Sequence, residues 1–244
     1  MLNWFKTSKE KLDPISFSVL KTDMHSHLIP GIDDGAQDLE SSIQMIKKLS
    51  SLGFSKLITT PHIMSDFYLN TEETINNGLS QLKEELIKEN IDIEITAAAE
   101  YYIDYEFENI LSKQKLLTFG DNYVLVEFSF IEKPRNILDI IFKLQIDGYK
   151  VILAHPERYA FLQQKDLEEF QNRGVLLQLN LLSIIGYYSH PIKKQAEWLI
   201  DNQMISFVGT DCHNINQSLL YEKCQKEQSW HNLINSGVLL NNTL

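Results

Sequence analysis

The sequence predicts an α/β barrel in which about seven parallel strands alternate with helices. Seven apolar runs of strand length are separated by helical patterns, and six of the seven runs end in His, Asp or Glu. Alternation of strands and helices is typical of a parallel sheet covered by helices. A barrel would bring the carboxyl ends of all strands, and these polar residues with them, to one face. An open doubly wound sheet also fits the alternation, but it would spread the polar residues along a line.

The expected strands are short and rich in apolar residues. They lie near residues 18–24, 55–60, 91–99, 122–128, 150–154, 175–180 and 204–209. Runs of this length bounded by turn residues are typical of buried strands. The sixth run ends at Asn180, whereas each of the others ends in an ionisable residue.

Helices are expected between these runs. In DLESSIQMIKKLSSLG, the apolar residues Ile43, Ile46 and Leu49 fall on one helical face. NTEETINNGLSQLKEELIKEN opens with Asn70, and Glu73 follows three residues later, close to a capping box. NILDIIFKLQIDGYK and HPIKKQAEWLIDNQ predict two later helices.

Length and composition restrict the kind of protein. The 244 residues suffice for a single domain (1–244), with an N-terminal extension (1–17) and a C-terminal helical segment (215–244). The net charge of −11 argues against a general grip on nucleic-acid phosphates. No apolar run approaches the ~20 residues of a transmembrane helix, so no membrane insertion is expected. Two cysteines are too few for a disulfide scaffold and fit a cytoplasmic protein.

Five of the seven histidines stand at the ends of the apolar runs, together with several carboxylates. These strand-end residues are His25, His27, His62, Glu100, Glu127, His155, Glu157, Arg158, Asp211 and His213. Histidine nitrogens combined with carboxylate oxygens suit zinc, manganese or iron. Each motif alone has a commoner structural explanation, such as a turn at PGIDDG. The joint pattern predicts a cluster of two or three metal ions that share a carboxylate bridge.

Alternation along a strand indicates which of these side chains face the cluster. His25 and His27 are two residues apart, as are Asp211 and His213, so each pair points to one face of its strand. Cys212 then points away, which makes it a poor candidate for a ligand.

Six motifs together carry a family resemblance. DMHSHLIPGIDDGA, TPH, AAAE, VLVEF, AHPERY and GTDCHN occur in this order between about residues 20 and 214. This set resembles the polymerase-and-histidinol-phosphatase (PHP) superfamily, and most closely the bacterial manganese-dependent protein tyrosine phosphatases of capsule and exopolysaccharide synthesis. The resemblance implies a distorted (β/α)7 TIM-like barrel, the PHP fold, with three metal ions at its C-terminal face.

The resemblance also implies which residues hold these ions. They are His25, His27 and Asp211 for the first ion, Glu100, Glu127 and His155 for the second, and Asp34, His62 and His213 for the third. Glu100 is implied to bridge the first two ions, and Asp33 is the alternative to Asp34. Manganese is the implied metal, with iron and zinc as alternatives.

Phosphate binding is implied for Arg158 in HPERY, which matches the phosphate-gripping arginine of the family. The related phosphatases usually carry a second arginine about one turn after the DxHN motif, where this chain reads NINQSLLYEKCQ. Leu220 stands at about the expected position. Lys223 and Lys226 are candidates to replace the arginine, without its planar fork.

The implied function is hydrolysis of phosphotyrosine on a protein, with a bacterial tyrosine kinase of polysaccharide export as the expected partner. Asp33 is a candidate proton donor to the leaving group, with Asp34 and His213 as alternatives. The alternative function is a histidinol-phosphate phosphatase or another small-molecule phosphoesterase of the superfamily. Short connections and the absence of a long insertion to enclose a metabolite favour the protein substrate. The sequence leaves the oligomeric state open.

Two further inferences follow from the residue types. A cysteine phosphatase is excluded, because the positions that a Cys-x5-Arg loop would fill with arginine hold Ser218 and Trp230. Aromatic residues after the strand ends are candidates to flank the phosphotyrosine ring or, singly, to belong to the core. They are Phe67, Tyr68, Tyr101, Tyr102, Phe128 and Tyr159.

Overall fold

The computed structural model describes residues 12–244, so residues 1–11 of the expected N-terminal extension lie outside the described part of the chain. Its strands are β1 (Thr22–Asp23), β2 (Lys56–Thr59), β3 (His62–Ile63), β4 (Glu94–Ala97), β5 (Glu100–Tyr102), β6 (Tyr123–Glu127), β7 (Lys150–Ala154), β8 (Leu176–Asn180) and β9 (Phe207–Gly209). They form two sheets, ordered β1-β2-β4 and β3-β5-β6-β7-β8-β9, and every neighbouring pair is parallel.

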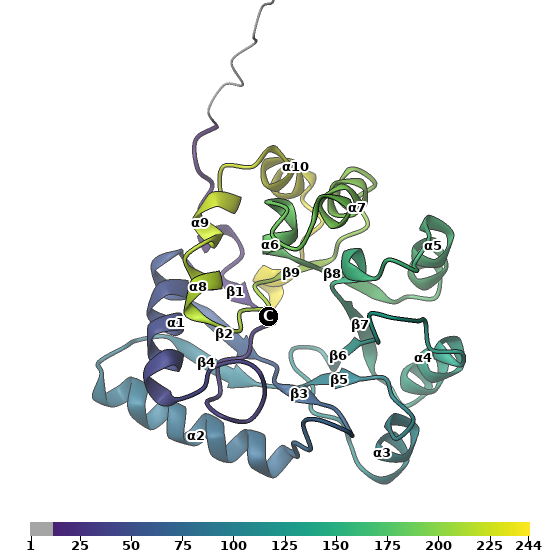
Figure 1. Cartoon of the computed structure of the whole chain (residues 1–244), viewed down its shortest axis with the longest axis horizontal. Helices are drawn as coiled ribbons and strands as arrows, with labels where there is room; N and C mark the ends of the chain where they lie inside the picture. The colour runs from purple at the N-terminus through teal and green to yellow at the C-terminus, as the bar shows by residue number, and fades with distance from the viewer. Residues whose placement is uncertain (1–11) are drawn as a thin grey trace, which may run out of the picture.

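The two sheets together make a barrel of seven strands. β3 continues β2 after a gap of two residues, and β5 continues β4 in the same way, so each pair is one interrupted strand. Ser26 forms a parallel bridge with Cys212, which brings the end of the last strand beside the end of the first. Figure 1 shows the helices arranged around these strands. The predicted α/β barrel is therefore confirmed.

Helices fill the connections between strands. They are η1 (Phe17–Val19), α1 (Leu39–Ser51), α2 (Glu72–Lys88), α3 (Phe107–Lys113), α4 (Ile137–Ile146), η2 (Pro156–Arg158), α5 (Gln164–Asn172), α6 (Leu181–Ile184), α7 (His190–Asp201), α8 (Ile215–Ser218), α9 (Tyr221–Cys224), α10 (Gln228–Ser236) and η3 (Asn241–Thr243). Within residues 12–244, none of these helices combines the length and the apolar character needed to cross a membrane.

Two local predictions need correction. The capping box of α2 is formed by Thr71 and Thr74 rather than by Asn70 and Glu73. Asn70 is engaged elsewhere, because its amide donates hydrogen bonds to the carbonyl oxygens of Ile32 and His62.

The first expected strand, 18–24, is shorter than predicted. Only Thr22–Asp23 pair as a strand, and Phe17–Val19 form the 3-10 helix η1. The aromatic ring of Phe17 packs against Phe54 and Trp230, with ring centroids 5.3 and 5.1 Å apart. This packing of Phe17 holds the chain in a 3-10 turn just before β1 begins.

The core has an inner and an outer part. The inner cluster fills the barrel with Met24, Ile58, Ala98, Phe119, Leu125, Ile152, Ala154 and Phe207. Leu240 and Leu244 pack against it, and Leu240 N–H donates to Ser206 O just before β9, so this segment covers the N-terminal end of the barrel. The larger outer cluster lies between strands and helices. The C-terminal end of the barrel is left to polar side chains.

Side chains complete the seam between β1 and β9. The Asp23 carboxylate accepts hydrogen bonds from the backbone N–H and the hydroxyl of Thr210, at 2.8 and 2.6 Å. The Asn241 amide donates to Thr22 O and Val208 O and accepts from Val208 N–H. These bonds add to the backbone hydrogen bonds from Asp211 N–H to His25 O and from His27 N–H to Cys212 O, which lie at the C-terminal end of the same seam.

Candidate metal centre and active site

The carboxyl ends of the strands bring all nine sequence-predicted ligands into one cluster. Eight of the nine form three overlapping groups, within each of which all donor atoms lie within 4.8 Å of one another. The groups are His25, His27, Glu100 and Asp211; His27, Asp34, His62 and His213; and His62, Glu100 and Glu127, beside which His155 lies. Overlapping groups of this kind fit several ions that share ligands.

The first group lies deepest. His25 Nε2 is 3.2 Å from Glu100 Oε2 and 3.3 Å from Asp211 Oδ1. His27 Nε2 is 3.4 Å from the same Glu100 oxygen. All four side chains are buried, so the charges face one another without solvent.

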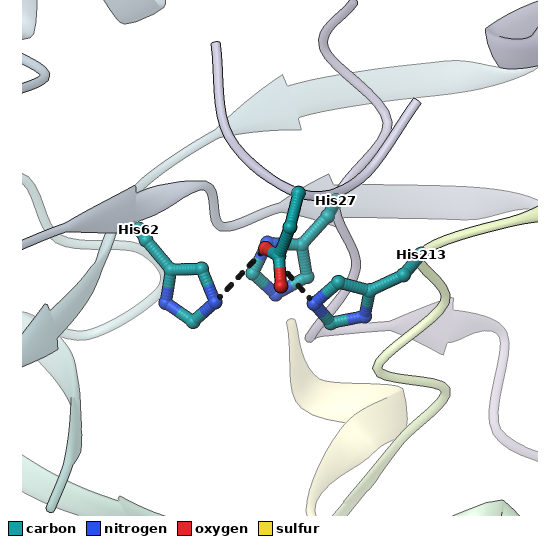
Figure 2. Close-up of side chains that lie close together, drawn as sticks. His27, His62 and His213 are labelled. Carbon is teal, nitrogen blue, oxygen red and sulfur yellow. Dashed lines mark ion pairs between the residues drawn. The ribbon is translucent and has the colours of Figure 1, made fainter. Parts of the chain in front are cut away.

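The second group lies nearer the surface. His62 Nε2 and His213 Nε2 are 3.4 and 3.5 Å from the same oxygen, Asp34 Oδ1. Figure 2 shows His27, His62 and His213 surrounding this carboxylate, with dashed lines for the two ion pairs. Asp34, the aspartate preferred over Asp33 from the sequence, therefore lies between these two histidines.

Glu100 links the third group to the first. Its Oε2 is 3.3 Å from His62 Nδ1, and its Oε1 is 3.2 Å from His155 Nε2. Glu127 contacts the same two histidines, with Oε1 2.9 Å from His62 Nδ1 and Oε2 3.8 Å from His155 Nε2. Glu100 thus faces four histidines and stands at the centre of the cluster.

The donor set fits metal ions. Nitrogen and carboxylate oxygen donors converge without a thiolate, as the borderline divalent cations prefer. The buried Nδ1 atoms of His62 and His155 lack a hydrogen-bond partner among residues 12–244, which is unusual for buried polar atoms. His62 Nδ1 lies 2.9 Å from Glu127 Oε1 and 3.3 Å from Glu100 Oε2 without making a hydrogen bond, an arrangement that a metal ion between these atoms would complete.

Three other histidines are held with Nε2 toward the cluster. Each Nδ1 faces a pure acceptor and must therefore carry the proton: His25 faces Gln178 Oε1 at 2.9 Å, His27 faces Asp33 Oδ2 at 2.7 Å, and His213 faces Asp211 O at 2.9 Å. This fixes the tautomer and leaves each Nε2 lone pair free to bind a metal.

The electrostatics agree with this geometry. Burial would raise the pKa of Glu100, but His25 and His62 hold it well below its usual range. Burial and the charge of His27 oppose protonation of His62, yet Glu100 and Glu127 raise its pKa to about 9. The low pKa of Glu100 thus depends on positive charge beside it, which the histidines provide when protonated and which divalent cations would provide in their place.

The structure explains why the turn PGIDDG holds a glycine at Gly35 and an aspartate at Asp33. A Cβ on Gly35 would lie 2.3 Å from His27 O, so only glycine permits this close approach. Asp33 accepts hydrogen bonds from His27 Nδ1–H, His62 N–H and Gly35 N–H. Asp33 therefore orients His27, and both of its oxygens are engaged, which differs from the free proton donor that the sequence suggested.

Two neutral residues of β8 join the cluster and carry no signal in the sequence. Gln178 Oε1 accepts from His25 and from the backbone N–H of His155, and its Nε2 donates to Asn180 Oδ1 at 2.9 Å. Asn180 Nδ2 donates onward to Asp211 Oδ2 at 2.6 Å. β8, the strand that does not end in an ionisable residue, thus positions ligand candidates that stand at the ends of other strands.

Local backbone conformation turns two ligands into the site. His155 and Asp211 have φ values of 35° and 52°, in the left-handed region that residues other than glycine rarely adopt. Such conformations cost of order 1–3 kcal/mol each and occur where surrounding structure enforces them. On β9, a Cβ at Gly209 would lie 2.6 Å from His25 Cβ, so glycine leaves room for that ring.

A pocket of about 310 Å³ opens above the cluster. Arg158 lines it, and its Nη1 donates to Asp211 Oδ2 at 3.0 Å. The guanidinium lies between two aromatic rings, 4.5 Å from the centroid of Phe130 and 4.3 Å from that of Tyr188. The two rings and the carboxylate hold the guanidinium plane against one wall.

Apart from Arg158 and the histidines, the residues that line this pocket are neutral or acidic. Lys223 is exposed on α9 and is absent from this lining, so the structure does not bring it to the pocket. Gln217 lines the wall instead, and its Oε1 accepts from His213 N–H, which leaves the amide nitrogen as its free donor. Tyr188 Oη accepts from Asn180 Nδ2, so its own proton is free to be donated.

Comparison with known proteins identifies close relatives. The family model described as "Capsular polysaccharide synthesis, CpsB/CapC" matches residues 21–226. The tyrosine-protein phosphatase YwqE of Bacillus subtilis (strain 168) is 33% identical over 196 residues, which cover 79% of this chain and 77% of YwqE.

Solved structures show the same relationship. A crystal structure from work on YwqE of Bacillus subtilis and CpsB of Streptococcus pneumoniae, described as unique metal-dependent tyrosine phosphatases, matches with a TM-score of 0.78 and 29% identity. The match covers 91% of this chain and 94% of that chain. Histidinol phosphate phosphatase from Lactococcus lactis, with zinc, L-histidinol and phosphate, matches at a TM-score of 0.54 and 14% identity, covering 90% and 94%. At that identity the likeness concerns the fold alone.

Proposed function

Because the chain belongs to the CpsB/CapC family of capsular polysaccharide synthesis, we propose that it is a metal-dependent phosphatase acting on protein phosphotyrosine. The observation that carries this proposal is the convergence of nine metal-ligand candidates beneath a pocket with one aromatic-clamped arginine. YwqE and CpsB, to which the chain is similar, are tyrosine phosphatases.

We assign three metal ions to the cluster, with manganese as the metal. His25, His27 and Asp211 hold the first ion, Glu127 and His155 the second with Glu100 shared, and Asp34, His62 and His213 the third. Bound divalent ions supply positive charge to offset the phosphate dianion and activate water near neutral pH. The overlap of the three donor groups at Glu100 and His62 supports this division.

The residues of the chain then have separate tasks at the substrate. The guanidinium of Arg158 binds non-bridging phosphate oxygens, since the two rings hold its plane and, within residues 12–244, its side-chain hydrogen bond is the one to Asp211. Tyr188 Oη and the Gln217 amide offer neutral donors in the pocket wall of a chain that lacks the second arginine implied by the family resemblance. Burial raises the pKa of the Tyr188 hydroxyl, so it stays protonated and donates.

The partner expected for this activity is an autophosphorylated tyrosine kinase of polysaccharide export. A phosphotyrosine on a protein segment can enter the open pocket from outside. Histidinol phosphate is the competing substrate, since an enzyme of the same fold binds L-histidinol and phosphate.

The deciding measurement compares kcat/KM on a phosphotyrosine peptide and on histidinol phosphate at one manganese concentration. We expect the peptide to be preferred by at least about tenfold, roughly 1.4 kcal/mol of transition-state binding. Chelation should abolish turnover of both substrates, and added manganese should restore it. A preference for histidinol phosphate would replace the substrate assignment, and full activity of metal-free protein would reject the metal mechanism.

The cysteines should be dispensable for this chemistry. Burial raises the pKa of the Cys212 thiol to about 12, and its Sγ contacts Asn214 O rather than the cluster. Cys224 is also buried, with Sγ 3.2 Å from Leu181 O. We expect a Cys212→Ser, Cys224→Ser double variant to keep most of its kcat on a phenyl phosphate. Loss of turnover with the fold and bound metal intact would contradict this prediction.

A further inference from the structure

Apolar side chains gather beside the pocket, on three loops that follow β3, β5 and β6. Eleven large hydrophobic side chains are exposed among residues 12–244, and five of them belong to these loops. We call them the apolar wing: Phe67, Leu69, Tyr105, Phe130 and Ile131. Ile131 is 89% exposed, and Phe67 and Tyr105 are each 72% exposed. An apolar patch of this kind on one face marks a binding surface.

The wing is held in place by the polar groups of its own loops. Met64 and Tyr68 form an antiparallel bridge with two backbone hydrogen bonds. Ser65 N–H donates to Asp104 Oδ2 at 2.9 Å, which ties the first loop to the second. Tyr105 Oη lies 3.3 Å from Asp66 Oδ1 across the same junction. These bonds hold the loop tips away from the barrel. The apolar side chains therefore stay exposed to solvent, although burying them would be energetically favourable.

A hollow of about 340 Å³ separates the second and third loops. Tyr102 and Tyr105 line one side, and Ser129, Pro134 and Arg135 line the other. This space is large enough to take a side chain of a bound peptide. Figure 1 places the ends of β3, β5 and β6 next to one another at the edge near α3.

The wing is continuous with the reaction pocket at two points. Phe130 belongs to the wing and also stacks on the Arg158 guanidinium inside the pocket. The ring of Tyr68, in the first loop, stacks on His62 with centroids 5.5 Å apart. A polypeptide whose phosphotyrosine reaches the cluster must therefore pass its neighbouring residues over these loops.

From this continuity we infer that the apolar wing is the docking surface for the substrate segment that flanks the phosphotyrosine, and that it binds apolar side chains of that segment. This inference rests on the proposed function and extends it from the phosphate to the residues around it. The wing contributes binding of the polypeptide and leaves the chemistry at phosphorus unchanged. It therefore acts on KM for peptides and has no effect on small aryl phosphates.

The test uses the full chain loaded with manganese and a triple variant, Phe67→Ser, Tyr105→Ser and Ile131→Ser. Phe130 stays unchanged because it touches Arg158. The substrates are a phosphotyrosine peptide with apolar flanks, the same peptide with Ser and Gly flanks, and p-nitrophenyl phosphate. For the apolar-flanked peptide we expect KM to rise about tenfold with kcat changed by less than about twofold.

A matched control removes equally exposed apolar side chains elsewhere. Phe142 and Ile146 on α4 are 60% and 67% exposed and lie outside the pocket lining. A Phe142→Ser, Ile146→Ser variant should behave as the wild type on all three substrates. The preference of the wild type for apolar over Ser and Gly flanks should disappear in the triple variant alone.

Several results would overturn the inference while leaving the proposed function intact. An unchanged peptide KM in the triple variant would reject the docking surface. Equal losses on p-nitrophenyl phosphate would show that the wing supports the pocket instead. A dimeric wild type that becomes monomeric in the triple variant would assign the wing to a second copy of the chain. If the wild type hydrolyses no phosphotyrosine substrate at all, the proposed function itself fails.

Discussion

Glu100→Gln should abolish nearly all phosphatase activity and lower the metal content of the purified protein. The Glu100 carboxylate lies 3.2–3.4 Å from four histidines, and we assign it as the bridge between two ions. Gln keeps the shape but removes the charge. Loss of about 4 kcal/mol of charge stabilisation corresponds to roughly a thousandfold fall in kcat/KM.

Two variants make this result interpretable. Glu127→Gln removes a carboxylate whose ion pairs within residues 12–244 are with His62 and His155, so it should cost less activity and less metal than Glu100→Gln. Glu157→Gln neutralises a buried carboxyl whose Oε1 accepts from Asn180 N–H and Ser183 Oγ, and the amide oxygen can still accept both bonds. It should leave the metal content unchanged. Normal metal content and activity in Glu100→Gln would reject the bridging role.

Arg158→Lys should lower kcat/KM by about 100-fold, or roughly 2.7 kcal/mol, while metal content and melting temperature change little. Lysine keeps the positive charge but has no planar fork and cannot stack between Phe130 and Tyr188. The measurements are kcat/KM on p-nitrophenyl phosphate, the inhibition constant of inorganic phosphate, and thermal unfolding.

The matched control is Arg173→Lys, because Arg173 also pairs with a carboxylate, Glu169, but on the exposed face of α5. It should be neutral in every measurement. If Arg158→Lys loses metal or unfolds as readily as it loses activity, Arg158 serves the Asp211 ion pair rather than the phosphate.

The barrel and its nine ligand candidates were predictable because both depend on strong, local patterns. Strand period places His25 and His27 on one face, and the barrel brings strand ends together whatever their distance in sequence. Eight of the nine candidates stand at or just after strand ends, where the sheet sets the backbone position. Asp34 is the exception, because it lies in the turn that follows β1 and was implied by the family resemblance alone.

Residues that act through loops or neutral groups were not predictable in the same way. Gln178 and Asn180 carry no charge, and their role depends on hydrogen bonds to residues on three other strands. The choice between Asp33 and Asp34 depends on how one turn folds around Gly35. Phe130 and Tyr188 meet only because Arg158 lies between loops from distant parts of the chain. Such contacts follow from tertiary structure and leave no periodic trace in the sequence.

The side-chain seam between the first and last strands has a consequence for how the protein is made. Asp23 bonds to Thr210 across 187 positions, and Asn241 bonds to Thr22 across 219. During synthesis, the ribosome must therefore release nearly the whole chain before the barrel can close. The ligand candidates His25 and Asp211 flank this seam, so the donor set of a nascent chain stays incomplete until the segment around Asp211 and His213 has emerged. Contacts of such high sequence separation form slowly, so we expect the metal centre to be completed late in folding.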